Sequence, residues 1–166
     1  MYNSYYSVYL GTDYDGGSTS KPYDDVVPYG NMRYKSSESF TISNGELTIP
    51  TSLNGTLFNF KYKVSYIMQM AGTGDSFVGE ELLMQWYDNN GGQWHDIDGD
   101  STTTFNKFAN YELHSPDIMI TKYGLTYHRI PVAITPNKYR VILRSYNGVP
   151  LRVLSNSIWY ALSIDN

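Results

Sequence analysis

The chain has 166 residues, no cysteine, 12 basic and 16 acidic side chains, and a formal net charge of −4. That length suits one domain with a core of its own, while the lack of cysteine excludes disulfide frameworks, thiolate metal sites and thiol nucleophiles. The N-terminus lacks a basic segment followed by an apolar one, and no run approaches the ~18 apolar residues of a membrane span, so we expect a soluble protein without a signal peptide or a membrane partner.

Residues 1–35 combine tyrosine-rich pieces with a segment, 11–22, that is rich in Gly, Ser, Asp and Pro. Such a segment is typical of a loop. We therefore expect an N-terminal arm with the first strands over residues 1–35, followed by a single β domain over residues 36–166.

The first predicted hairpin is centred on an Asn-Gly pair. Two short β-type runs, 39–43 and 46–50, flank Asn44 and Gly45. An Asn-Gly pair is the preferred centre of a two-residue type I′ turn, so these runs should form an antiparallel hairpin. A second turn at residues 53–56 leads into the next strand.

Residues 56–70 alternate between apolar and polar side chains, with Phe58 and Phe60 on one parity and Lys61 and Lys63 on the other. A period of two predicts a β-strand with one buried face. At ~3.4 Å per residue such a strand would exceed the span of a compact domain of this size. We therefore expect a bulge, a bend or an early end near its last residues.

Short β-type runs separated by turn signals fill much of the rest of the chain. They are 81–88, 117–124, 125–134, 138–147, 150–155 and 157–165. No segment repeats apolar residues at helical spacing over three turns, so helix is expected at most as a short insert near residues 103–113. The pattern predicts an all-β fold, an antiparallel β-sandwich of jelly-roll type. The expected core residues are Phe58, Phe60, Tyr62, Val64, Tyr66, Leu82, Met84, Trp86, Val141, Leu143, Ile158, Tyr160 and Leu162.

The sequence shows no catalytic motif. Its three histidines, His95, His114 and His128, have no metal-ligand spacing, and it contains neither a G-x-S-x-G nucleophile motif nor a phosphate-binding glycine loop. We therefore expect a protein that is not an enzyme and needs no cofactor.

One acidic turn places Asp96, Asp98 and Asp100 at alternate positions around a glycine, as an oxygen-rich calcium loop would. Its register departs from that of an EF-hand loop, because Ser101 and Lys107 stand where the Gly and the final Glu are required. We favour a solvated turn without a metal. The three carboxylates are the candidate ligands if calcium binds.

Charge is unevenly distributed along the chain. No Lys or Arg occurs from residue 64 to residue 106, a stretch with seven acidic side chains, whereas residues 107–166 carry seven basic side chains and three acidic ones. This split suggests a ring in which the acidic region 75–100 of one copy meets the basic region 138–152 of the next, since contacts between two different patches can close into rings. The net charge of −4 argues against nucleic acid as a partner.

The segment "HRIPVAITPNKYRVILRSYNGVPLRVLSNSIWYALSID", residues 128–165, resembles the last strands of trimeric jelly-roll heads. These are the tumour-necrosis-factor-like and complement-head-like domains that also crown viral and phage fibres. In such heads a long alternating strand, a short hairpin and a final strand pack at the three-fold axis. The corresponding segments here are 139–146, 151–154 and 158–164. The lack of cysteine and the many Tyr, Asn, Ser and Gly residues also resemble small virion structural proteins.

The resemblance implies assembly and attachment. It predicts a non-enzymatic subunit of a phage or virus, such as a head fibre, decoration protein or capsid accessory protein, located in the virion and assembled in the host cytoplasm. Its partners would be itself, as a homotrimer, and other virion proteins. The residues expected at the interface between copies are Lys61, Lys63, Tyr139, Arg140, Arg144, Tyr146, Arg152 and Trp159.

The alternative is a carbohydrate-binding jelly roll whose partner is a surface glycan. Aromatic side chains exposed on a sheet can stack on sugar rings while their polar atoms stay in water. The candidates for this role are Trp86, Tyr87 and Trp94.

Overall fold

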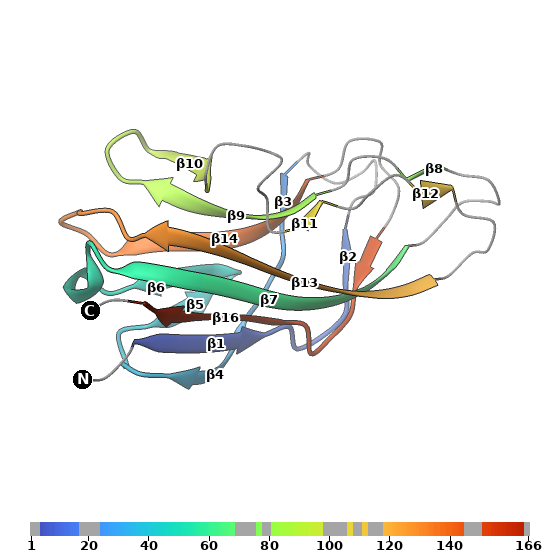
Figure 1. Cartoon of the computed structure of the whole chain (residues 1–166), viewed down its shortest axis with the longest axis horizontal. Helices are drawn as coiled ribbons and strands as arrows, with labels where there is room; N and C mark the ends of the chain where they lie inside the picture. The colour runs from blue at the N-terminus through green and yellow to red at the C-terminus, as the bar shows by residue number, and fades with distance from the viewer. Residues whose placement is uncertain are drawn as a thin grey trace.

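The computed structural model describes residues 4–16, 24–68, 76–77, 81–97, 106–107, 111–112, 118–144 and 151–164. Most of these residues lie in antiparallel β-strands, and one short 3-10 turn, η1 (Thr51–Leu53), precedes the strand β7 (Leu57–Met68). Two large sheets pack against each other (Figure 1). The predicted all-β antiparallel sandwich is therefore confirmed.

Sheet A is built around one long strand. Its strands in spatial order are β2 (Tyr14–Gly16), β15 (Leu151–Val153), β7 (Leu57–Met68), β16 (Ile158–Ser163), β1 (Tyr5–Tyr9) and β4 (Asn31–Lys35), and β13 (Ile118–Arg129) also pairs with β7. β13 follows one edge of β7 from end to end, while β15 and β16 share the other edge. In Figure 1, β13, β7, β16, β1 and β4 run side by side.

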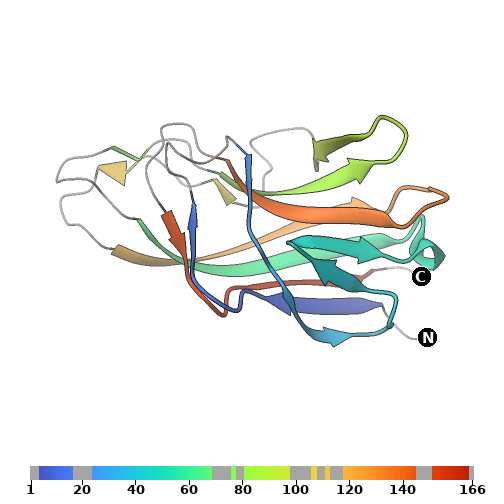
Figure 2. The same ribbon diagram turned by 180° about the vertical axis from the view of Figure 1, so that it is seen from behind.

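Sheet B covers the inner face of sheet A and is seen from behind in Figure 2. Its strands in spatial order are β10 (Gln93–Asp96), β9 (Glu81–Asp88), β14 (Asn137–Arg144), β6 (Glu46–Ile49) and β5 (Thr41–Ser43), with β11 (Asn106–Lys107) paired to β9 and β3 (Asp24–Val26) paired to β14. A separate pair joins β8 (Ser76–Phe77) to β12 (Tyr111–Glu112).

The inward-facing side chains of β7 form much of the surface that sheet A contributes to the core. Phe58, Phe60, Tyr62, Val64 and Tyr66 are all at most 1% exposed. Side chains of this size contribute ~1.5–3 kcal/mol each when fully buried. The described strand runs from Leu57 to Met68, and residues 69–70, at the place where a bulge, a bend or an early end is expected, lie outside the described residues.

The two sheets meet through aromatic rings. Phe60 of β7 packs on Tyr139 of β14 with ring centroids 5.3 Å apart, and within sheet A Tyr6 of β1 meets Trp159 of β16 edge-on at 5.5 Å. Such pairs add stability beyond the area that they bury. Aromatic rings from both sheets therefore contribute to one hydrophobic core.

The last strand buries the opposite parity from the one predicted. Ile158, Tyr160 and Leu162 were expected in the core, but Trp159 and Ala161 are buried there, while Tyr160 and Leu162 are exposed and Ile158 is half-buried. The pairing with β7 is the reason, because it sets Trp159 opposite the buried Tyr62. Since both parities of β16 are apolar, either could have filled the core.

Two further expected core residues, Trp86 and Leu82, lie on β9. Trp86 is only partly buried at the edge of the core. The side chain of Leu82 lies outside the part of the chain whose burial is described.

The N-terminal segment does not stand apart from the sandwich. β1 pairs on one side with β16 and on the other with β4. Its residues Tyr6 and Val8 are buried in the same core as the aromatic residues of β7. Of residues 1–35, where an arm and the first strands are expected, the described part thus supplies β1, β2 and β4 of sheet A and β3 of sheet B.

The predicted Asn-Gly turn joins β5 to β6. Asn44 and Gly45 have φ angles of 52° and 79°, as a type I′ turn requires. A Cβ added at Gly45 would lie 2.6 Å from the carbonyl oxygen of Val27. Gly55, in the turn after η1, also has a positive φ of 82°, but no atom lies within 4 Å of the corresponding position.

These two glycines give a matched pair of variants. Gly55→Ala should cost about 1 kcal/mol, since only the left-handed backbone disfavours the methyl group. Gly45→Ala should cost about 3 kcal/mol, because a clash with backbone adds to the same strain. Urea unfolding at equilibrium measures both. Equal losses for the two variants would contradict the close approach at Gly45.

The buried tyrosines predict a response to alkaline pH. Burial raises the pKa of Tyr6, Tyr29, Tyr62 and Tyr139 well above the ordinary value of about 10. Because the folded state favours the neutral phenol, these groups contribute stability below the pKa of the unfolded chain and lose it as pH rises toward their folded-state pKa.

We therefore expect the chain to lose its native circular dichroism as pH rises above about 10. The phenolate absorbance of the buried rings should appear in the same transition. Complete ionisation of all 17 tyrosines with native circular dichroism would contradict the burial of these phenols.

Candidate interaction surface

Large apolar side chains gather on the outer face of sheet A, on the side away from the core. We call this surface the tyrosine face; its members are Tyr5, Tyr34, Leu125, Tyr127, Tyr160 and Leu162, each between 38% and 65% exposed. They come from four strands, β1, β4, β13 and β16. Exposed apolar side chains that cluster in this way mark interaction sites more often than the same residues scattered singly.

Strand register makes the tyrosine face continuous. Tyr160 lies opposite Ser7 of β1 and Lys61 of β7. Lys61 in turn lies opposite Leu125 of β13, and Ser7 lies opposite Tyr34 of β4. Residues directly opposite in an antiparallel pair share a face, so one row of side chains crosses all five strands.

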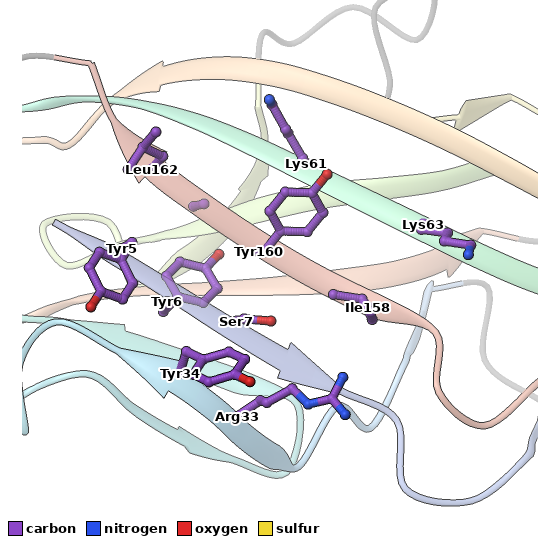
Figure 3. A pocket seen from close by; sticks show the side chains of 11 residues that line it. Tyr5, Tyr6, Ser7, Arg33, Tyr34, Lys61, Lys63, Ile158, Tyr160 and Leu162 are labelled. Atoms are coloured by element: carbon purple, nitrogen blue, oxygen red, sulfur yellow. The ribbon is translucent and has the colours of Figure 1, made fainter. Parts of the chain in front are cut away.

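An open groove with a volume of 620 Å³ lies within this face. Tyr5, Tyr34, Tyr160 and Leu162 line it, with Ser7 among them (Figure 3). Lys61 and Lys63 flank the groove from β7, and Arg33 flanks it from β4. Its lining thus combines apolar rings with hydroxyl and cationic donors.

The charge of this face differs in sign from that of the chain. β1, β4, β7, β13 and β16 contain no Asp or Glu, although they carry several Lys and Arg residues. The chain as a whole has a net charge of −4. The face is therefore a cationic surface on an acidic protein.

Two of the predicted interface residues lie where a partner could reach them, because Lys61 and Lys63 are on the outer side of β7 beside the groove. Two others, Tyr139 and Trp159, are fully buried, and their predicted role at an interface is wrong. Tyr139 shares the inner parity of β14 with Val141, and Trp159 packs on Tyr6.

Two arginines of the predicted basic region, residues 138–152, make contacts within the chain. Arg140 donates from Nε to Gln85 Oε1 at 2.8 Å, and its guanidinium carbon lies 4.1 Å from the centre of the Trp94 ring. Arg152 donates from Nε to Asp15 Oδ1 at 2.7 Å. These contacts engage the guanidinium groups of Arg140 and Arg152 within the chain.

The remaining predicted interface residues fall where less is described. Arg144 belongs to β14, but its side chain is outside the described part of the chain. Tyr146 lies in residues 145–150, which are also outside it.

The predicted sugar-stacking residues divide between two faces of sheet B. Tyr87 and Trp94 are cross-strand neighbours with ring centroids 5.2 Å apart, and both are half-buried. Trp86 points the other way, toward the core, and lies 5.2 Å from His95 and 6.2 Å from His128. Adjacent residues on a strand point to opposite faces, so only Tyr87 and Trp94 can share a surface.

The acidic turn shows no metal site in its described part. Asp96 accepts a hydrogen bond from Gln85 Nε2 at 2.9 Å, and Asp98 and Asp100 lie outside the described residues. Within the described ranges no group of three potential ligands could hold a metal ion. Asp88 has a lowered pKa, chiefly because the backbone N–H of Asn90 donates to it, with a smaller contribution from His95.

Sequence reasoning missed the tyrosine face. Tyr34, Tyr127 and Tyr160 were not candidates for an interaction site, although the absence of acidic residues from their strands is visible in the sequence.

Across the described residues, no helix is both long enough and apolar enough to cross a bilayer.

Comparisons with known proteins identify the fold. No family model matches the sequence, and no curated protein matches it. Murine APRIL aligns over 98% of this chain and 100% of its own, with 7% identity and a TM-score of 0.59. The globular domain of a zebrafish complement 1qA protein aligns over 99% of this chain and 100% of its own, with 11% identity and a TM-score of 0.55.

The fold is a jelly roll of the tumour-necrosis-factor and complement-head type. Such low identities concern the fold alone. The resemblance noted in the C-terminal third of the sequence is therefore confirmed for the architecture, and in this jelly roll the tyrosine face is the outer surface of sheet A.

Arg140 gives a test of the contacts on sheet B. In Arg140→Met the buried amide oxygen of Gln85, a residue only 3% exposed, loses its charged donor, which should cost about 1–3 kcal/mol. The emission of Trp94 should also change, because the guanidinium leaves its ring. Urea unfolding and tryptophan fluorescence measure the two effects.

Lys138→Met is the matched control, since Lys138 is an exposed cation on the same strand. Its stability should stay within about 0.5 kcal/mol of the wild type. Equal behaviour of the two variants would contradict a structural role for Arg140.

Proposed function

We propose that the protein acts through assembly, and that copies of the chain associate through the tyrosine face into a homotrimer. The observation that carries this proposal is the row of exposed tyrosine and leucine side chains across sheet A. Tyrosine is enriched at the centres of protein interfaces because it buries a large rigid area and keeps a polar tip. The core already occupies the inner face of the sheet, so only the outer face can serve this purpose.

The fold supports a trimer. In the trimeric heads that the C-terminal third resembles, the final strands pack at a three-fold axis, and here the final strand β16 carries Tyr160 and Leu162 on the tyrosine face. This surface replaces the earlier proposal of a contact between residues 75–100 and 138–152.

The role that we propose for the trimer is that of a virion structural or attachment subunit, such as a head fibre, decoration protein or capsid accessory protein. Other virion proteins would be its further partners, and the virion its location. Support comes from the sequence, which lacks cysteine, is rich in tyrosine and resembles fibre heads in its final strands. Such a subunit would bind other virion proteins and would not act as an enzyme.

A carbohydrate-binding role is the second candidate, and the pair formed by Tyr87 and Trp94 favours it. The guanidinium of Arg140 lies over the Trp94 ring, so a sugar would stack on what remains accessible. This role would use sheet B, whereas assembly would use sheet A. A glycan bound at Trp94 would quench its fluorescence whether or not copies associate.

The self-association proposal is tested by solution mass. Light scattering at micromolar concentration should give three times the chain mass of 18.9 kDa. Tyr160→Lys should return the protein to the mass of one chain, because it removes a large apolar contact, worth ~2 kcal/mol or more at the centre of an interface, and adds a second cation opposite Lys61. The fold should survive, since Tyr160 is 38% exposed in the single chain.

Ile134→Lys is the control. Ile134 is fully exposed but lies in the turn between β13 and β14, away from the tyrosine face. This variant should keep the wild-type mass. A wild-type mass of 18.9 kDa at both low and physiological salt would rule the trimer out.

A further inference from the structure

The groove in the tyrosine face has cations on two sides and no acidic residue in its lining. Lys61 and Lys63 stand on β7, and Arg33 stands on β4 (Figure 3). The guanidinium carbon of Arg33 lies 5.5 Å from the centre of the Tyr9 ring. The intervening strands contribute hydroxyl groups, among them that of Tyr160. Every polar side chain of the lining can donate a hydrogen bond to an anion.

Lys61 lies near the middle of this face. In the register of sheet A, Lys61 lies opposite Leu125 of β13 on one side and opposite Tyr160 of β16 on the other. Both neighbours are members of the tyrosine face. A second copy that covers these two residues must also cover Lys61. Burying an ammonium group without a partner is costly, and bringing several copies of the same cation together adds repulsion.

The chain offers little in its described part to neutralise this charge. The five strands that run side by side in sheet A contain no carboxylate. On sheet B, Asp88 is engaged by His95 and the backbone of Asn90, and Asp96 accepts a hydrogen bond from Gln85. A neighbouring copy that docks through the same face therefore brings the same cations and no carboxylate from these five strands.

We propose that a multivalent oxyanion such as sulfate or phosphate binds in this groove when copies associate, held by Lys61 with Lys63, Arg33 and the tyrosine hydroxyls. This inference rests on the proposed self-association and adds that the bound oxyanion regulates it. The anion neutralises the cations that assembly removes from water, and its binding and assembly strengthen each other by the same factor. Assembly then responds to the concentration of free oxyanion.

The sign of one substitution separates this arrangement from a salt bridge between copies. If Lys61 meets a bound anion, Lys61→Gln removes repulsion and the need for the anion, so the variant associates more tightly in chloride. If Lys61 meets a carboxylate of the neighbouring copy, the same variant associates more weakly. The amide keeps a polar donor of similar length in either case.

Sedimentation equilibrium of the full chain in sodium chloride and in millimolar sodium sulfate, at equal ionic strength, provides the test. For the wild type, sulfate should raise the association constant about tenfold. Lys61→Gln should associate about tenfold more tightly than the wild type in chloride and should not respond to sulfate. Lys138→Gln, an exposed lysine of sheet B, should behave as the wild type in both salts.

Two controls keep the result specific. Sulfate also strengthens apolar contacts in general by exclusion from surfaces, and that effect would persist in Lys61→Gln. A heparin-derived tetrasaccharide carries sulfate on a body too bulky to lie between packed copies. If it promotes association while free sulfate does not, the oxyanion proposal is wrong.

The proposal is also overturned if sulfate leaves the wild type unchanged or if Lys61→Gln associates more weakly. An oligomer that ignores sulfate would refute the anion alone and leave self-association standing. A wild type that stays monomeric in every salt would refute both.

Discussion

Sheet A depends on the hydrogen-bonded ladder of β7, because β13, β15 and β16 all pair with this one strand. Its inner aromatic side chains form one wall of the core, while Lys61 and Lys63 lie on its outer side. A slip of one residue would exchange the two faces, burying lysine and exposing phenylalanine. One register therefore fixes both the interior of the sandwich and the chemistry of its surface.

The sequence predicts β7 and β14 well because, apart from Asn137 at the start of β14, the inner parity of each is apolar, while the outer parity carries Lys or Arg. β16 lacks that contrast. Trp159 and Ala161 alternate with Tyr160 and Leu162, so its own residues leave the buried parity undecided. Pairing with β7 decides it, since Tyr160 falls opposite Lys61 and must face the same way. Tyrosine adapts to either side of a sheet, which is why its abundance alone reveals little.

The candidate surface was predictable only in part, because pairing between distant strands decides which side chains share it. Lys61 and Lys63 follow from local alternation, whereas Tyr34 and Tyr127 join them through strands distant in sequence. Contacts between distant segments also occupied the arginines expected at an interface: Arg152, for example, reaches Asp15. The one signal available beforehand was the lack of acidic residues in the five strands.

The pairing of β1 with β16 has a consequence for how the protein is made. The backbone N–H of Ser4 donates to the hydroxyl of Ser163, 159 residues away, and Tyr6 packs on Trp159 in the same region. Contacts of such long range form late and slow the folding of β proteins. During synthesis β1 and β4 can therefore join β7 in sheet A only after β16, which lies between β1 and β7, has left the ribosome. Until then the tyrosine face is not continuous.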